Sequence, residues 1–333
     1  MHDQKCNNSI YRFLFWVFCP VLLMSIIIVA SKSVYADNYM EVSAYYLRIE
    51  MLVPAFAAMV SKLYIQRNET PAKKFYYFYI VFIGILFFLS ILSIFLHISN
   101  INNIFPNVFF ISSIVGFLIL MSLSPEERAA AGLSSINNQK MFLCILLFVV
   151  LHTLNNCVIR ILNYLFLPKD LPITSVIGSL SFQSILPRFL GFFVSYLCFL
   201  GEEYGWRYFL QNELSRNFGK VKSILIVGLI WSVFHFPADV IRLAPNEIPI
   251  ELLARCAVCI SLAFFFGWVY EYTHNIWAIV IIHFSHNNLT QVWIPPENSS
   301  NLAYLSFLLV FLIPFAFIIY KTEQKKKETK LRS

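Results

Sequence analysis

The sequence has few charged residues: only 13% of its 333 residues are Asp, Glu, Lys or Arg. A soluble domain carries about 25% charged residues and is about half apolar, whereas 59% of this chain is hydrophobic and 34 residues are Phe. Long apolar runs recur from one end of the sequence to the other, which excludes a soluble domain with a single membrane anchor. The composition therefore predicts a polytopic membrane protein.

The sequence also lacks a nucleic-acid-binding face and a disulfide framework. The net charge is +7, but the basic residues lie in short segments between apolar runs and are not interleaved with aromatic residues, which excludes nucleic acid as a partner. The 7 cysteines fall mostly within apolar runs. Cys256 and Cys259 form a CxxC spacing, which suggests redox chemistry in a soluble fold. Because they lie in an apolar helix here, we interpret both as packing residues.

Hydropathy predicts an all-α fold, a polytopic membrane helix bundle of about 8–10 transmembrane helices. The candidate spans run near residues 10–30, 43–65, 75–97, 103–123, 141–165, 185–212, 220–238, 252–271, 274–293 and 302–320. The span at 43–65 is polar for a membrane helix, since it contains Arg48, Glu50 and Lys62. We expect the first span to stay uncleaved, although Val34-Tyr35-Ala36 resembles a signal peptidase site, because its apolar run exceeds the roughly 7–15 residues of a signal peptide.

The chain divides into N-terminal transmembrane helices at 1–140, a membrane core at 141–320 with polar motifs at 202–287, and a basic tail at 321–333. Basic residues concentrate in alternate loops and in this tail, whereas the opposite loops hold only Lys32, Lys169 and Arg242. By the positive-inside rule, we expect both termini in the cytoplasm, and we expect the membrane to be a bacterial inner membrane.

Ionisable side chains inside apolar runs are candidates for function, because an unpaired charge at the bilayer centre costs about 3 kcal/mol or more. The stretch FLGEEYGWRYFL (199–210) contains three of them, Glu202, Glu203 and Arg207. Glu203 and Arg207 are spaced i,i+4 with the acid first, which favours an ion pair on one helix face. Glu202 then lies about 100° around the helix and is free to face something else.

Later spans add two imidazoles and an amide. At a rise of about 1.5 Å per residue, these groups and the free carboxylate lie near the middle of a hydrocarbon core about 30 Å thick. We therefore expect four side chains to converge there in an arrangement suited to activating water: Glu202, His235, His283 and Asn287.

Three segments carry a resemblance to a known family. EEYGWR (202–207), WSVFHFP (231–237) and HFSHN (283–287) resemble the ordered EExxxR, FxxxH and HxxxN motifs of the CPBP family of intramembrane proteases, which includes the type II CAAX prenyl endopeptidases. Any one motif is weak, but three in order on successive apolar segments are fairly specific. Trp231 stands where the second motif usually has Phe, a departure that alters the packing beside His235 and removes no reactive group.

The resemblance implies an intramembrane endopeptidase that hydrolyses peptide bonds of membrane-associated peptides or proteins. It implies Glu202 as the general base on a water molecule that His283 holds. His235 and Asn287 would donate hydrogen bonds to the developing oxyanion. Arg207, paired with Glu203, would keep Glu202 in register.

The metal requirement stays open. The favoured interpretation needs no cofactor, and the sequence contains no HExxH motif. One carboxylate and two His residues nevertheless match a catalytic zinc set, so Glu202, His235 and His283 are the expected ligands if a metal is present. The expected partners are membrane lipid and a peptide or protein substrate at the bilayer.

Two other classes of function stay open. A transporter relays protons through buried acids and His, but the chain shows no repeat between its halves. A non-proteolytic scaffold or bacteriocin-immunity protein would keep the fold without needing the acid of Glu202. Outside the motif positions assigned above, we interpret His286 as a hydrogen-bonding residue at a helix interface and His152 as an interfacial or packing residue. We expect Arg48 and Glu50 to pair with a neighbouring helix or to lie at the membrane interface.

Overall fold

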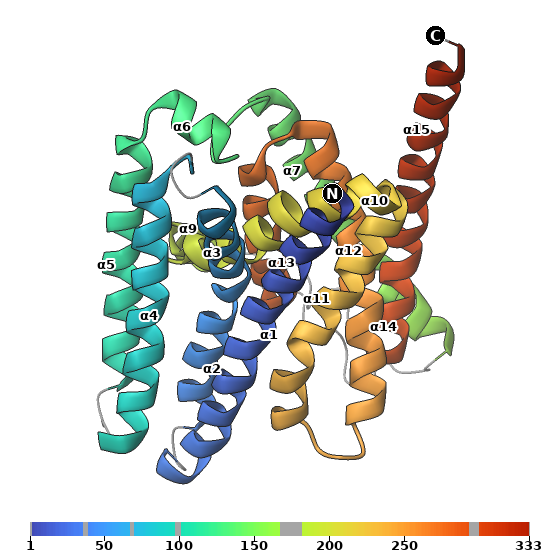
Figure 1. Ribbon diagram of the computed structural model, residues 1–333. Coiled ribbons are helices and arrows are strands. Elements are labelled where there is room, and N and C mark those ends of the chain that lie inside the picture. Colours follow the sequence, from blue (N-terminus) through green and yellow to red (C-terminus); the bar gives the residue numbers. More distant parts are fainter. Residues whose placement is uncertain are drawn as a thin grey trace. The chain divides into compact units, whose positions relative to one another are not determined.

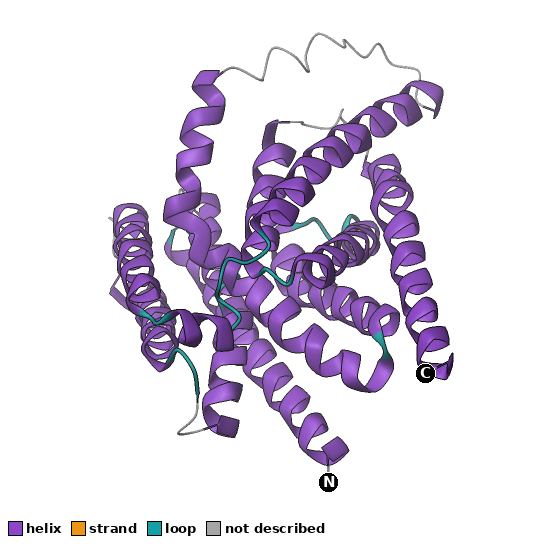
Figure 2. Ribbon diagram, turned by 90° about the horizontal axis from the view of Figure 1, so that it is seen from above, coloured by secondary structure: helices purple, strands orange, loops and turns teal. Residues whose placement is uncertain are grey.

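The computed structural model describes residues 2–35, 39–66, 70–96, 101–166, 182–292 and 300–332. All regular secondary structure in these ranges is helical (Figure 2), which confirms the all-α fold predicted from the sequence. Ala36, at the end of the signal peptidase-like sequence, lies outside the described residues. The elements follow in chain order as α1 (His2–Val34), α2 (Tyr39–Glu50), α3 (Val53–Gln66), α4 (Lys73–Leu96), α5 (Ile101–Ser122), α6 (Pro125–Ala130), α7 (Asn138–Phe166), α9 (Phe182–Glu203), η1 (Tyr204–Gln211), α10 (Asn212–Phe218), α11 (Lys220–Arg242), α12 (Ile248–Thr273), α13 (Ile276–Val292), α14 (Ser300–Phe307), η2 (Leu308–Leu312) and α15 (Ile313–Arg332) (Figure 1).

The protein is an integral membrane protein. Within the described ranges, 7 stretches of helix are long and apolar enough to cross a membrane. Their outward side chains are apolar: Phe95 is 76% exposed and Leu253 is 73% exposed, as is expected where lipid replaces water around a helix. The spanning stretches are Asn8–Val34, Lys73–Leu96, Asn103–Ser122, Asn138–Leu162, Lys220–Ile241, Ile248–Thr273 and Tyr304–Thr329.

Three of the predicted spans are absent from that set for separate reasons. The span at 43–65 is divided into α2 and α3 by a turn at residues 51–52, and Pro54 lies in the first turn of α3, where its missing N–H is tolerated. The span at 185–212 is divided between α9, which ends at Glu203, and the π-helix η1. The span at 274–293 corresponds to α13, which has 17 residues.

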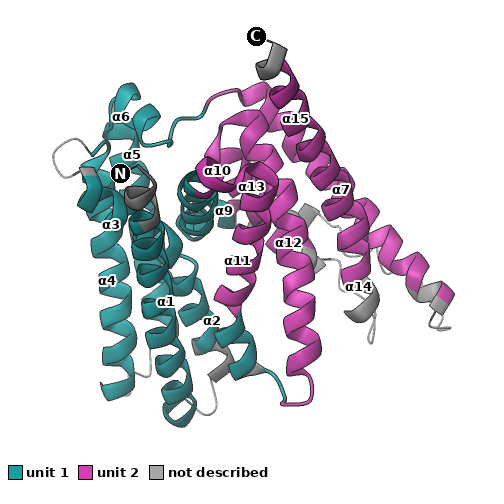
Figure 3. Ribbon diagram, turned by 45° about the vertical axis from the view of Figure 1, so that its right-hand side comes forward, with its two compact units in different colours: residues 1–135, 191–213, 236–244 teal, residues 136–190, 214–235, 245–333 magenta. Residues whose placement is uncertain are grey.

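The helices form two compact units, shown in different colours in Figure 3. Unit 1 comprises Met1–Ser135, Gly191–Glu213 and Phe236–Ala244. Unit 2 comprises Ile136–Leu190, Leu214–His235 and Pro245–Ser333. Each unit therefore collects segments that are far apart in the sequence, and the division at residue 141 made from the sequence stays a prediction.

In unit 1, α1 packs against α2, α3 and α4, and α3 packs against η1. Phe13 on α1 contacts two aromatic rings of η1, with ring centroids 5.8 Å from Trp206 and 5.0 Å from Phe209. The hydroxyl oxygens of Tyr76 on α4 and Tyr204 on η1 lie 2.5 Å apart. The first helix is therefore part of the core that surrounds η1.

In unit 2, α12 is the central helix and packs against α7, α13, α14, η2 and α15. Phe265 on α12 lies among aromatic rings, with its centroid 5.8 Å from Phe148, 5.6 Å from Phe311 and 4.8 Å from Phe315. The helix ends at Thr273, and the C-cap residue His274 has a left-handed φ of 51°. This reversal turns the chain into α13, the helix that carries the HFSHN motif.

Candidate active site

Two glycines let the segment that carries EEYGWR pack directly on the break between α2 and α3. A Cβ atom on Gly201 would lie 2.3 Å from the carbonyl oxygen of Met51, and one on Gly205 would lie 2.4 Å from Cβ of Pro54. Neither distance is physically possible, so only glycine allows this backbone approach. Small residues four apart are a common device for close helix packing in membranes. Glu202 and Glu203, which lie between the two glycines, are thereby held at this break.

The segment changes from an α-helix to a π-helix directly after Glu203. The π-helix η1 covers Tyr204–Gln211 and contains Arg207. Such wide turns are rare and often occur at functional sites. Seven of its eight residues are buried, so the widened helix is part of the core of unit 1.

Glu203 and Arg207 form the ion pair that their spacing predicts. Nε of Arg207 donates a hydrogen bond to Oε2 of Glu203 at 3.0 Å, and both side chains are 0% exposed. The pair neutralises two charges that would otherwise be costly inside the bundle. It also joins the end of α9 to η1 and fixes the rotation of the helix at Glu202.

Glu202 lies in an acidic neighbourhood within unit 1. Its side chain is 1% exposed, and its carboxylate is close enough to Glu50 for a charge–charge interaction. Asp239 interacts with Glu50 in the same way. From the sequence, Glu50 was expected to pair with a neighbouring helix or to lie at the membrane interface; the structure buries it within unit 1, beside the candidate general base.

Unit 2 brings two of the predicted imidazoles together. Trp231 on α11 contacts both, with ring centroids 6.1 Å from His235 and 5.6 Å from His283. Phe234 lies 5.1 Å from His235, and Phe266 lies 5.6 Å from His283, again between ring centroids. His235 and His283 are also close enough for their charges to interact. These two side chains thus share one aromatic setting, with Trp231 against both.

The remaining polar residues of α13 divide between two sides of the helix. Asn287 lies one turn beyond His283 and is partly exposed. His286 packs with other rings, at centroid distances of 5.8 Å from His152 and 5.9 Å from Phe307. These ring contacts place His152 and His286 between packed helices of unit 2, and the hydrogen bond expected of His286 stays a prediction.

The comparison with known proteins identifies the segment that holds these motifs. The model of the family described as type II CAAX prenyl endopeptidase Rce1-like matches residues 183–289. This segment is an Rce1-like domain. It covers about a third of the chain and contains EEYGWR, WSVFHFP and HFSHN, which confirms the resemblance to the CPBP family found in the sequence. No curated protein and no solved structure matches the chain.

The predicted catalytic residues of the Rce1-like domain come from both units. Glu202, Glu203 and Arg207 belong to unit 1, whereas Trp231, His235, His283 and Asn287 belong to unit 2. The convergence of the Glu202 carboxylate with the imidazoles on one water molecule stays a prediction.

The residues of a single unit do not fit a catalytic zinc ion, which takes three protein ligands. Unit 2 supplies only the two imidazoles of the predicted set, His235 and His283. Among the described residues, no group of three or more His, Cys, Asp or Glu side chains is arranged to hold a metal ion. The zinc set that includes Glu202 therefore stays an alternative for experiment.

The structure adds a cation that the sequence analysis did not single out. Arg255 on α12 is close enough to His235 and His286 for charge–charge interaction. Arg255 and His235 lie in consecutive helices, each about seven residues from the connection between α11 and α12. An arginine within an apolar run was the signal available in the sequence, because such charges are seldom retained without a role.

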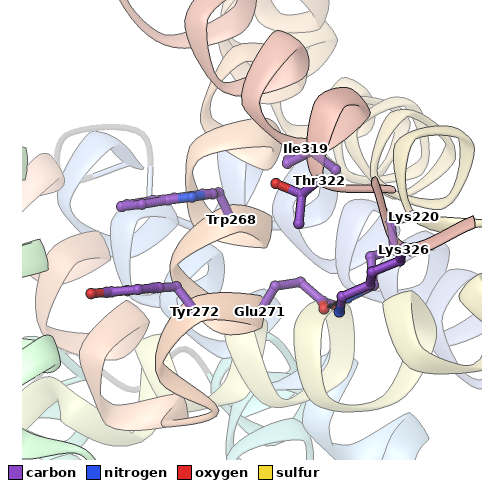
Figure 4. Close-up of a pocket in the computed structure, with 7 residues that line it drawn as sticks. All are labelled: Lys220, Trp268, Glu271, Tyr272, Ile319, Thr322 and Lys326. Atoms are coloured by element: carbon purple, nitrogen blue, oxygen red, sulfur yellow. Dashed lines mark ion pairs between the residues drawn. The ribbon is translucent and has the colours of Figure 1, made fainter. Parts of the chain in front are cut away.

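A pocket of about 150 Å³ in unit 2 lies among the start of α11, the end of α12 and the middle of α15 (Figure 4). Trp268 and Tyr272 form one wall as parallel rings with centroids 5.4 Å apart. Lys220 pairs with Glu271 at another wall, and Lys326 contributes a second ammonium group. Because no predicted catalytic residue of the Rce1-like domain lines this pocket, we do not assign the candidate active site to it.

Proposed function

We propose that the protein is an intramembrane endopeptidase that cleaves membrane-associated peptides or proteins with a water molecule activated by Glu202. The observation that carries the proposal is the Rce1-like match at residues 183–289. Within this match the EExxxR motif, His235 and the HxxxN motif occur in order on three separate helical segments. Glu202 is buried beside a preformed ion pair, which suits a base that must keep one orientation.

The proposed reaction begins with Glu202 taking a proton from water, while the water oxygen forms a bond to the carbonyl carbon. His283 holds and orients this water. His235 and Asn287 donate hydrogen bonds to the carbonyl oxygen as it becomes negative, and removing one such donor typically lowers the rate by about 10²–10³-fold. The protonated Glu202 then gives its proton to the leaving amine.

Three residues support this set. Glu203 and Arg207 fix the helix register of Glu202 through their ion pair. Trp231 restricts the rings of His235 and His283, since it contacts both. Its indole replaces the family's usual Phe and gives a larger contact surface of the same aromatic type.

We propose a metal-free mechanism. The alternative is a zinc ion held by Glu202, His235 and His283, which would polarise the carbonyl and activate the water. Incubation of the purified protein with 1,10-phenanthroline separates the two. The metal-free mechanism predicts unchanged cleavage, and loss of cleavage that added zinc restores would establish the metal mechanism.

The substrates would lie at or within the bilayer, and we propose a bacterial inner membrane with both termini in the cytoplasm. The decisive experiment compares membrane peptides from cells that lack the protein with those from cells that produce the wild type or the Glu202→Gln variant. Gln has nearly the same shape as Glu but does not take up the proton. We expect new peptide termini only with the wild type, at equal protein levels.

A matched control uses the two histidines of α13. His283→Phe should abolish cleavage, whereas His286→Phe should retain it, because a Phe ring can take the place of His286 against His152 and Phe307. If Glu202→Gln produces the same termini as the wild type, the protein is not a protease of this type, and a scaffold or immunity role becomes the better explanation. Proton or solute flux in liposomes would instead indicate a transporter.

A further inference from the structure

Glu50 is in an unfavourable position for a residue with only a structural role. It is the last residue of α2, where the negative end of the helix dipole repels an anion. Its side chain is 3% exposed. Its Oε1 atom has no hydrogen-bond partner among the described residues. A buried polar atom in this condition normally indicates a functional role or an unseen water molecule or ion.

The backbone contact at Gly201 explains why Glu50 and Glu202 are neighbours. A Cβ atom on Gly201 would lie 2.3 Å from the Met51 carbonyl oxygen and 2.8 Å from Cα of Leu52. Each glutamate therefore lies one residue away from a point where two backbones touch. The two carboxylates interact electrostatically, and Asp239 also interacts with Glu50. All of these residues belong to unit 1.

Among the residues that the structure describes, no cation forms an ion pair with Glu50. Arg48, two residues earlier, is exposed, and its guanidinium lies over the ring of Tyr45 at 5.3 Å from the centroid. Tyr79 on α4 uses its hydroxyl for the carbonyl oxygens of Leu52 and Leu197. The group that satisfies Glu50 must therefore bring its own hydrogen-bond donor.

We propose that Glu50 is a second water-binding carboxylate of the active site, whose free oxygen orients the water molecule that Glu202 deprotonates. This inference rests on the proposed function. One O–H bond of the water points to Glu202 and the other to Glu50, so that the oxygen lone pair is directed at the scissile carbonyl carbon. When Glu202 takes its proton, the lone pair forms the new C–O bond, and the carbonyl π electrons move to the carbonyl oxygen. Glu50 itself is unchanged.

Two substitutions distinguish this role from a structural one. Glu50→Gln keeps one oxygen that accepts a hydrogen bond, whereas Glu50→Met has similar length and no such acceptor. Because orientation errors of about 1 Å cost up to about 10²-fold in rate, we expect Glu50→Met to lower kcat by roughly 10–100-fold. The kcat of Glu50→Gln should lie between those of Glu50→Met and the wild type. KM should stay the same, since the substrate's binding contacts remain.

Thermal stability provides the second readout. Replacing a buried, unsatisfied acid with an apolar side chain removes a desolvation cost, so Tm of Glu50→Met should equal or exceed that of the wild type. Glu251→Met is the matched control, because Glu251 lies on a helix of unit 2 and accepts a hydrogen bond from Tyr304 at 3.1 Å. This control should lower Tm and leave kcat unchanged.

The assay uses purified protein in liposomes and a membrane peptide extract from cells that lack the protein, followed by kinetics on the peptide that is cleaved fastest. A wild-type kcat for Glu50→Met would overturn the inference. So would a lower Tm together with a loss of rate that matches the loss of folded protein. If Glu202→Gln is inactive and Glu50→Met is fully active, the role of Glu50 is refuted and the proposed protease function stands. If Glu202→Gln is active, the proposed function itself is refuted.

Discussion

The buried ion pair of Glu203 and Arg207 gives the sharpest test of the structure. At a separation of 3.0 Å with both side chains 0% exposed, two unit charges attract by about 5–6 kcal/mol at an effective dielectric constant of about 20. Removing one partner leaves the other charge buried and unpaired, which typically costs about 3–5 kcal/mol. We therefore expect Arg207→Met to lower the free energy of unfolding by about 3–5 kcal/mol.

The double variant Glu203→Leu/Arg207→Met should recover most of this loss, because a packed apolar pair often replaces a buried ion pair at little cost. The assay is detergent unfolding followed with a thiol-reactive dye, since Cys144, Cys198 and Cys259 are buried free thiols that unfolding exposes.

The pair of Lys220 and Glu271 is a suitable control, because its side chains are 31% and 19% exposed. A partly exposed pair contributes about 0–1 kcal/mol, so Lys220→Met should have little effect. An Arg207→Met variant that unfolds like the wild type, or a double variant no more stable than the single one, would contradict this role of the ion pair.

Two further predictions concern packing around the candidate site. Gly201→Ala should destabilise unit 1 and lower cleavage, because the added methyl group would lie 2.3 Å from the Met51 carbonyl oxygen. Gly191→Ala is the control, since no atom lies within 4 Å of a Cβ placed there. Equal stability of the two variants would contradict the close contact at Gly201. Trp231→Phe should keep most of the cleavage activity and Trp231→Ala should lose it, because an aromatic ring is needed against His235 and His283. Peptide cleavage rates test this prediction. A fully active Trp231→Ala variant would show that the indole does not position the imidazoles.

Much of the fold could be predicted from the sequence, because a long apolar segment in lipid must form a helix. Residues 73–96 and 101–122 are long, apolar and nearly uncharged, and the predicted spans at 75–97 and 103–123 agree with α4 and α5 to within about two residues. In a membrane, backbone groups must be satisfied within the helix, so hydropathy and helix length are closely linked. The ion pair between Glu203 and Arg207 was predictable for a similar reason, since i,i+4 spacing is a local property.

Features that depend on contacts between distant segments were not predictable. The break between α2 and α3 was missed because the span at 43–65 was interpreted as one helix. Glu50 was expected to pair with a neighbouring helix or to lie at the membrane interface, and its place beside Glu202 depends on this break. The π-helix η1 was missed because nothing in YGWRYFLQ requires it without its neighbours. Gly205 packs on Pro54, about 150 residues earlier in the chain. The sequence shows both residues but not their contact.

The widened turn of η1 gives this segment one place that tolerates a change of length. Loss of one residue after Arg207 would let the helix tighten to ordinary α geometry, and the flanking helices would keep their relative rotation, because a π-turn holds about one residue more than an α-turn. Loss of one residue from α9 has no such outlet and would rotate Glu202 by about 100° relative to the start of that helix. Both deletions would keep every motif letter, yet only the second would turn Glu202 away from its present surroundings.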